Sequence, residues 1–304
     1  MYKFIGSLLL ASFILVGSGC ATTYNPATGQ NELIFITTPV ETSIGNMVSA
    51  RVANQFKFSA DKEETERLSE IGKKLVSVSD RKDLKYKFTV IEDDSLNAFT
   101  IPGGYIYVNT GVLEKASDDE LACVIGHEIG HVAARHIAKK LQTQIGYNIV
   151  MSIASKSGNL GELQRAASIS FDLISLGYSR EDELQGDRLG AKYAHKAGYD
   201  PYAMVTFLEK IKKEEKGNIG PVFLRSHPYA SQRIKLLKKA IPDIIAKLDN
   251  KSSTKKIPHQ EQRLTPKRKS DAIEERPLKI MCPKCKKIFS GKTTNYCPYD
   301  GTKL

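Results

Sequence analysis

The sequence predicts an α+β fold that is mainly helical, with a small antiparallel sheet beside one buried helix and a separate small module at the C-terminus. Three observations support this prediction. Apolar residues recur with helical spacing in several segments, two short segments alternate as strands do, and a basic stretch precedes residues 279–304. A chain of 304 residues that is 41% hydrophobic and 26% charged is long enough to bury a sizeable core.

Residues 1–19 are predicted to be a signal peptide. Lys3 precedes an apolar run that is shorter than the roughly 20 residues a membrane-spanning helix needs. Three small residues then lead to Cys20, which resembles a bacterial lipobox, in which this cysteine is lipidated and begins the mature protein. Gly17 stands where that pattern usually has Leu, so an uncleaved anchor and ordinary secretion are the alternatives. Because Ala21 resembles outer-membrane lipoproteins, we expect a lipid-anchored envelope protein on the periplasmic face of the outer membrane.

The segment 20–45 is polar and rich in turn-forming residues, and we expect it to lead into a folded domain over residues 46–250. At the start of this domain, Ser59 is placed to cap a helix that runs to about Val78. The next segment, "LKYKFTVI", alternates as a half-buried strand should. A second strand is predicted for "YIYV" at 105–108, after a Pro-Gly-Gly break, and a helix follows.

That helix contains "SDDELACVIGHEIGHVAARH", the most informative stretch of the sequence. Ser117 and Glu120 have the spacing of a capping box, which marks the helix start. His127 and His131 lie four residues apart, about 40° around a helix axis and about 6 Å along it, so both imidazoles can bind one Zn²⁺. Glu128 lies beside such a metal without separating the two ligands, which suits a general base that takes a proton from water.

The third histidine of this stretch is predicted to serve elsewhere. His136 is five residues beyond His131, about 140° around a continuing helix, so it is expected to point away from the site as a structural or surface histidine. The helix itself is expected to be buried, since apolar residues flank the motif. Imidazole and carboxylate groups in such a place need partners, and a metal supplies one.

The remaining metal ligand is expected to be a downstream carboxylate. The segment "YSREDELQGDRLG" supplies Glu181, Asp182 and Glu183 in a second predicted helix, and spacing alone does not choose among them. Glu183 and Asp187 share one helical face, so one can bind metal while the other accepts a hydrogen bond from a ligating imidazole. Glu183 is therefore the leading candidate.

Four separated segments together resemble one protein family. In order they are "NAFTIPGGYIYVNTG", "ELACVIGHEIGHVAARH", "YSREDELQGDRLG" and "SHPYASQRI", and the resemblance covers roughly residues 24–248. They resemble gluzincin zinc metallopeptidases of the CAAX prenyl protease and beta-barrel assembly-enhancing protease type. The resemblance implies a zincin-type metallopeptidase domain with one catalytic Zn²⁺, acting as an endopeptidase on misfolded or unassembled envelope proteins.

The resemblance also assigns roles to particular residues. It makes Glu128 the catalytic base and Asp187 a supporting residue, and it makes the zinc ligands His127, His131 and Glu183. Gly186 stands where the family usually has Ala, a change between two small residues.

Two further elements gain a role from this context. His227, held by Pro228, lies in a loop that in the resembling proteases can approach the zinc, where it either fills the open metal position or donates to the developing oxyanion. Arg233 is a further electrostatic candidate. We also expect an extended substrate to add as a further strand beside Gly104, Tyr105, Ile106 and Tyr107. The alternative function is that of a chaperone-like, substrate-binding lipoprotein whose zinc site is closed and weakly active.

The net charge of +11 is concentrated near the C-terminus. Residues 251–292 carry thirteen Lys and Arg against four Asp and Glu, a net charge of +9, so the rest of the chain is nearly balanced. Residues 251–278 are predicted to be a flexible basic linker. Because the charge belongs to a linker, we expect no nucleic-acid partner; protein substrates and the membrane are the expected partners.

Residues 279–304 are predicted to form a zinc-ribbon-like module. Cys282 and Cys285 form one CPxC knuckle, and a second begins at Cys297, with Asp300 where a fourth cysteine would stand. Carboxylates can bind zinc, so one prediction is a second, structural Zn²⁺ held by these four residues. The alternative is a disulfide between Cys282 and Cys285, or a remnant without metal.

Overall fold

The computed structural model describes residues 22–154, 160–214, 222–253, 279–281 and 288–290. The chain divides into two compact units, residues 1–256 and 257–304. Several predicted features lie outside the described residues, namely the signal peptide, nearly all of the basic linker, Cys20, Cys282, Cys285, Cys297 and Asp300.

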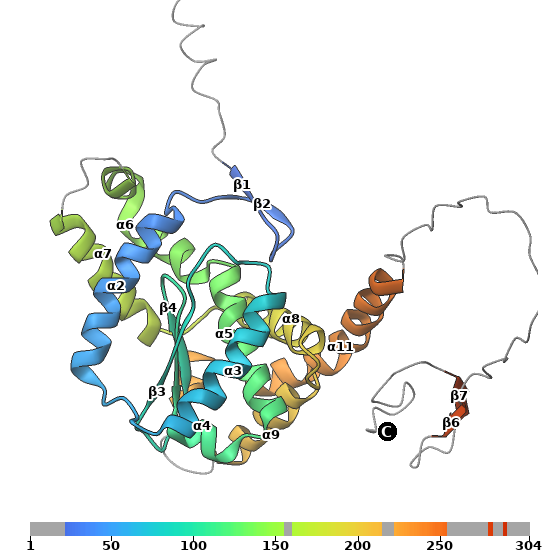
Figure 1. The fold of residues 1–304 in the computed structure, drawn as a ribbon. Helices are drawn as coiled ribbons and strands as arrows, with labels where there is room; N and C mark the ends of the chain where they lie inside the picture. The colour runs from blue at the N-terminus through green and yellow to red at the C-terminus, as the bar shows by residue number, and fades with distance from the viewer. Residues whose placement is uncertain (1–21, 155–159, 215–221, 254–278, 282–287, 291–304) are drawn as a thin grey trace, which may run out of the picture. The chain divides into compact units, whose positions relative to one another are not determined.

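The first unit is an α+β structure that is mainly helical, as the sequence predicts (Figure 1). In chain order its elements are β1 (Thr22–Asn25), β2 (Gln30–Leu33), α2 (Thr38–Gln55), α3 (Lys62–Val78), β3 (Lys87–Ile91), β4 (Ala98–Ile101), β5 (Tyr105–Asn109), α4 (Thr110–Lys115), α5 (Asp118–Ala133), α6 (His136–Ala154), α7 (Leu160–Ser175), α8 (Arg180–Lys196), α9 (Ala203–Glu214), α10 (Val222–Ser226) and α11 (Ala230–Ser253). In the second unit, β6 (Lys279–Met281) and β7 (Ile288–Ser290) pair antiparallel. Among the described residues, none of the helices combines the length and the apolar character that crossing a membrane requires.

The N-terminal segment is more ordered than its polar composition predicts. β1 and β2 form an antiparallel hairpin, and α2 begins at Thr38, so the predicted boundary between residues 45 and 46 falls inside a helix. α2 buries Ile44, Val48 and Val52 in a core that it shares with β4, β5, α6 and α7. Tertiary packing therefore forms this helix, since its own sequence carries little amphipathic pattern.

The sheet differs from the predicted antiparallel one because it has a third strand. The strand order is β3-β5-β4, with β3 parallel and β4 antiparallel to β5. β4 lies between the two predicted strands in the sequence and reverses the chain, so β3 and β5 run in the same direction. Tyr105, Ile106 and Tyr107 thus lie on a central strand that is paired on both sides. The prediction that an extended substrate adds beside this strand is therefore wrong, because no free edge exists there.

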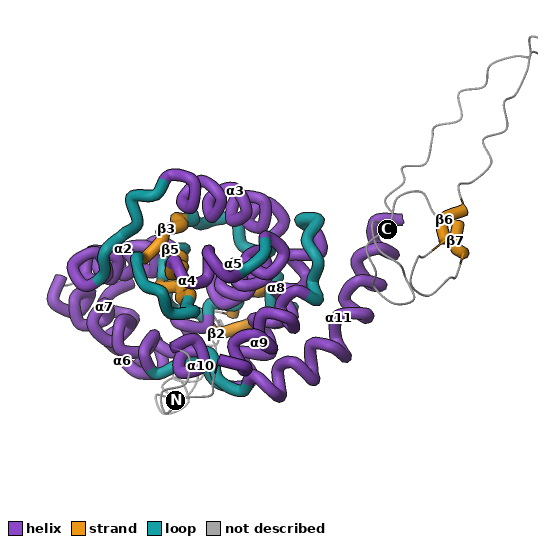
Figure 2. Tube along the Cα trace, turned by 90° about the horizontal axis from the view of Figure 1, so that it is seen from below, coloured by secondary structure: helices purple, strands orange, loops and turns teal. Residues whose placement is uncertain are grey.

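α5 lies at the centre of the unit. It contacts α3, α8, α9 and β4, and nearly all of its residues are buried. In the view from below in Figure 2, α5 and α8 run side by side. Their close approach depends on glycines: a Cβ at Gly190 would lie 2.8 Å from the backbone nitrogen of His127, and one at Gly126 would lie 3.1 Å from the carbonyl oxygen of Gly190. The close packing of α5 against α8 therefore sets the distance between the side chains that these two helices carry.

The start of α5 agrees with the sequence prediction, whereas the predicted cap of α3 is wrong. Ser117 and Glu120 form the predicted capping box of α5 with reciprocal hydrogen bonds. α3 ends at Val78 as predicted, but its N-cap is Asp61, and Ser59 instead accepts a hydrogen bond from the Asp61 amide.

Candidate metal centre

Four buried side chains from three parts of the chain converge on one volume. His127 and His131 come from α5, Glu183 from α8, and His227 from the loop between α10 and α11, and their ligand atoms all lie within 4.8 Å of one another. The Nε2 atoms of His127 and His131 are 2.9 Å apart. His227 Nδ1 lies 3.2 Å from His127 Nε2 and 3.0 Å from Glu183 Oε1. The structure thus brings the three predicted ligands together with His227.

Several polar atoms around this volume have no hydrogen-bond partner in the described part of the chain. They include both carboxylate oxygens of Glu128, His227 Nε2 and the hydroxyl of Tyr178. Buried polar atoms are normally hydrogen-bonded, so a group of them aimed into one place indicates that further species bind there. Imidazole nitrogens and carboxylate oxygen are the donor set that zinc takes in catalytic sites. The residues present therefore fit a zinc ion together with water.

Glu128 is fully buried beside the cluster. Burial raises the pKa of its carboxyl group, and the nearby Glu183 raises it further, while His227 and His127 oppose this shift. His227 Nε2 lies 3.4 Å from Glu128 Oε1. A carboxylate with a raised pKa and no other partner is suited to accepting a proton.

The carboxylates of α8 are held in the charged form. Burial favours the neutral form of Glu183, but the Arg233 guanidinium and His227 outweigh it and hold the pKa of Glu183 well below its usual range. Asp187 Oδ1 lies 3.0 Å from Nδ1 of His127, which orients that ring toward the centre. Arg233 in turn contacts Glu183 Oε2 at 2.8 Å. The supporting position that the resemblance gives to Asp187 agrees with this geometry.

His136 does not point away from the site, so that prediction is wrong. α5 ends at Ala133, and Arg135 adopts a left-handed backbone conformation with φ 57°. The chain therefore turns before His136, which begins α6, and the 140° rotation expected for a continuous helix does not apply. His136 is buried, and its Nδ1 lies 2.7 Å from Nδ1 of His131. Burial also lowers the pKa of His136, which favours the neutral ring.

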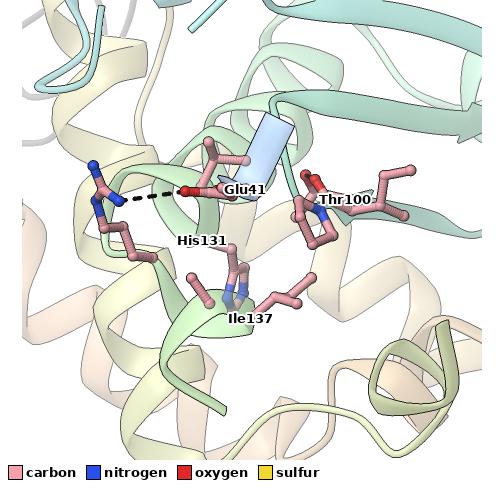
Figure 3. Close-up of a pocket in the computed structure, with 9 residues that line it drawn as sticks. Glu41, Thr100, His131 and Ile137 are labelled. Atoms are coloured by element: carbon pink, nitrogen blue, oxygen red, sulfur yellow. Dashed lines mark hydrogen bonds and ion pairs between the residues drawn. The ribbon is translucent and has the colours of Figure 1, made fainter. Parts of the chain in front are cut away.

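A group of charged residues supports the turn at the end of α5. Arg81 donates to the Val132 carbonyl oxygen at 2.9 Å and forms a buried ion pair with Glu41 of α2, with Nη2 and Oε2 2.7 Å apart. Arg135 also reaches Glu41, at 3.4 Å. Figure 3 shows Glu41 and His131 on the wall of one small pocket.

Tyr178 is a site residue that the sequence analysis missed. Its ring stacks on that of His131, with centroids 3.7 Å apart, and burial raises the pKa of its hydroxyl well above the usual range, with Glu128 adding to the shift. Tyr178 opens the segment "YSREDELQGDRLG", so its place directly before the α8 cap was the one available signal. No sequence pattern marked Glu41 or Arg81.

Comparisons with known proteins agree with this geometry. Residues 62–241, more than half of the chain, match the family described as Peptidase family M48. Mitochondrial metalloendopeptidase OMA1 of Schizosaccharomyces pombe is 32% identical over 179 residues, 58% of this chain and 52% of that protein. Metalloprotease LoiP of Escherichia coli is 30% identical over 177 residues, 57% of this chain and 69% of that protein.

A further relative is the beta-barrel assembly-enhancing protease of Escherichia coli, which is 28% identical over 183 residues, 56% of this chain and 37% of that protein. The chain thus spans about half of the length of the OMA1 relative and less of this one. The matches confirm the resemblance seen in the four sequence segments. The chain belongs to peptidase family M48.

Proposed function

We propose that the protein is a zinc-dependent metalloendopeptidase of the bacterial cell envelope that cleaves misfolded or unassembled envelope proteins. The observation that carries this proposal is the Glu128 carboxylate, which has no hydrogen-bond partner among the described residues and lies beside the buried cluster of His127, His131 and Glu183. Membership of family M48 supports the zinc peptidase chemistry. The name of one Escherichia coli relative, the beta-barrel assembly-enhancing protease, supports a role in the envelope.

Different residues of the chain have different proposed roles in hydrolysis. His127, His131 and Glu183 would hold the zinc, which when bound polarises a carbonyl and makes water more acidic. Glu128 accepts the proton of the attacking water on its carboxylate and returns it to the leaving amine. Asp187 keeps the His127 ring aimed at the centre, since it contacts the opposite ring nitrogen.

His227 gives the site a closed form. Catalytic zinc sites usually keep three protein ligands and one open position, whereas here a fourth candidate ligand atom, a nitrogen of His227, lies within the same group. We propose that His227 withdraws when a substrate binds, which would free both the metal position and Glu128. A chaperone-like binder would share the closed cluster, but it would need no buried base, so the arrangement of Glu128 favours the enzyme.

The substrate is proposed to bind in extended form at a sheet edge. β4 forms one edge of the sheet and contacts α5, and its residues Thr100 and Ile101 line the same small pocket as His131. Strand addition at this edge uses main-chain hydrogen bonds, so it selects unfolded or extended chains over folded ones.

The anchor and the C-terminal module complete the proposal. A lipidated Cys20 would attach the protein to the membrane, on the periplasmic face of the outer membrane. A second, structural zinc would be held by Cys282, Cys285, Cys297 and Asp300. Mass spectrometry of the protein purified from a bacterial envelope tests the first point, and zinc content before and after removal of residues 279–304 tests the second.

Casein cleavage by the purified protein tests the peptidase directly. We expect the wild type to cleave casein, and we expect Glu128→Gln or a zinc chelator to abolish cleavage, while Glu128→Gln still binds zinc because it retains all the ligands. Glu114→Gln, at an exposed glutamate on α4, is the matched control. Equal cleavage by wild type, Glu128→Gln and chelated protein would refute the zinc-peptidase proposal.

A further inference from the structure

The two histidine ligands of α5 each contact a second group through the ring nitrogen that faces away from the centre. His127 uses Asp187 for this, whereas His131 uses another histidine, His136, with 2.7 Å between the two Nδ1 atoms. A contact between two imidazole nitrogens is a hydrogen bond only when one nitrogen carries a proton and the other does not. The direction of this bond therefore decides which nitrogen of His131 is free for a metal.

The far side of His136 fixes that direction. Its Nε2 lies 2.8 Å from Gln185 Oε1 and 3.4 Å from Asp182 Oδ1, both on α8. The carboxylate of Asp182 has no hydrogen to donate, and its other oxygen already accepts from the Ser179 amide in the α8 capping box. Both neighbours are thus acceptors, so His136 Nε2 carries the proton.

The protonation of the remaining nitrogens follows from this step. A neutral His136 with its proton on Nε2 presents a lone pair at Nδ1, which can only accept. His131 must then donate from Nδ1, and its Nε2, which faces the metal centre, keeps its lone pair. The opposite direction would place an unprotonated Nε2 of His136 against two acceptors.

We propose that His136 is a positioning residue that sets the tautomer of His131 and so prepares Nε2 of His131 for zinc. The hydrogen bonds run from the start of α8 through His136 to His131 of α5. The helix that supplies the candidate ligand Glu183 therefore also sets the tautomer of a candidate ligand on α5. This inference rests on the proposed zinc site, and it assigns a role to the one histidine of the motif that lies outside the ligand set.

The fold places His136 where this role requires. Because Arg135 is left-handed, α6 starts in a new direction and returns His136 to the metal-binding face of α5. The guanidinium of Arg135 holds the turn by donating to Thr38 Oγ1 at 3.0 Å and to the Ile36 carbonyl oxygen at 3.3 Å. A regular helix through residue 136 would have lost the contact.

The tautomer can be observed directly in the wild-type protein before zinc is added. Long-range proton–nitrogen NMR spectra of the protein labelled with ¹⁵N-histidine distinguish protonated from unprotonated ring nitrogens. We expect His131 to carry its proton on Nδ1 and His136 on Nε2. A proton on Nε2 of His131 would overturn the proposal, and this measurement needs no variant to fold.

Substitutions at His136 test the consequence for zinc. His136→Leu removes the acceptor at similar bulk, and we expect zinc affinity, measured by chelator competition, to fall about 10- to 100-fold, as for other groups behind metal ligands. His136→Asn keeps an acceptor oxygen near the position of Nδ1, so it should restore most of the affinity and the Nδ1 proton of His131. His195→Leu is the matched control. His195 lies near the C-terminal end of α8 and contacts Asp249 of α11.

The outcomes separate this proposal from the zinc site on which it depends. If the wild type binds zinc but His136→Leu binds it equally tightly with the His131 tautomer unchanged, the positioning role is refuted. If the wild type itself binds no zinc at this site, the proposed function fails instead. Loss of zinc affinity in His136→Leu with recovery in His136→Asn supports the positioning role of His136.

Discussion

Arg233 and Asp187 form a fully buried ion pair with two parallel contacts beside the candidate metal ligands. Nε of Arg233 lies 2.9 Å from Oδ2 of Asp187, and Nη2 lies 2.6 Å from Oδ1. The same guanidinium contacts Glu183 and donates to the carbonyl oxygen of His227 at 3.2 Å. The Arg233 guanidinium therefore contacts the candidate ligand Glu183 and Asp187, the partner of His127. It also holds the loop that carries His227.

Removing this cation should destabilise the fold strongly. Arg233→Met leaves two buried carboxylates without a compensating charge, and breaking a buried pair in this way costs about 3–5 kcal/mol. Arg233→Lys should recover only part of the loss, because an ammonium group cannot make the two parallel contacts. Denaturant unfolding measures both. Arg180→Met, which breaks the exposed pair with Glu181, is the control and should change stability little.

Opening the centre should increase activity. In His227→Ala the fourth candidate ligand is removed, so we expect casein cleavage to rise while zinc affinity falls, since three protein ligands leave a position for water. Initial rates at saturating zinc give the comparison. A decrease in the rate at full zinc occupancy would instead assign His227 the alternative role of stabilising the oxyanion.

Separating α5 from α8 should weaken the site without touching any ligand. A Cβ at residue 190 would lie 2.8 Å from the backbone nitrogen of His127, and backbone cannot move aside as a side chain can. We expect Gly190→Ala to cost about 1–3 kcal/mol of stability, as overpacking does, and to lower zinc affinity. Arg188→Ala, on the exposed face of the same helix, is the control. Unchanged unfolding and zinc binding in Gly190→Ala would contradict the close packing.

The capping box of α5 should make stability depend on pH. Burial raises the pKa of Glu120, but hydrogen bonds from Lys210, the Ser117 amide and Thr206 outweigh it, so the net shift is downward. The stabilisation is then present above the unfolded pKa of about 4.3 and is lost as pH falls through the lower folded pKa. We expect wild type to exceed Glu120→Gln in free energy of unfolding at neutral pH, and this difference should shrink in acid.

The same titration with Glu114→Gln, an exposed glutamate, accounts for the general effect of losing one carboxylate. A difference between wild type and Glu120→Gln that stays constant across the acidic range would show that the hydrogen-bonded carboxylate contributes no pH-dependent stability.

Local patterns in the sequence were sufficient for the centre of the site. The spacing of His127 and His131 and the shared face of Glu183 and Asp187 are helical relationships, and α5 begins at the capping box that the sequence marks. These features depend on neighbours along the chain, so they could be read without the structure.

What the sequence could not show depends on distant partners. No glycine or proline marks the turn at Arg135, which forms through contacts with residues about a hundred positions earlier, so the place of His136 was assigned wrongly. The third strand was missed because β4 has only four residues, all buried, and shows no alternation. α2 was missed because its burial comes from the core it joins.

The left-handed backbone conformation of Arg135 depends on residues near the N-terminus. That conformation costs about 1–2 kcal/mol, and the contacts that offset it are on Ile36, Thr38 and Glu41, all before residue 62, where the family match begins. A fragment cut to the matched region would keep the candidate metal ligands and lose the contacts that hold the turn. The residues that support this turn therefore lie outside the segment by which the family is recognised.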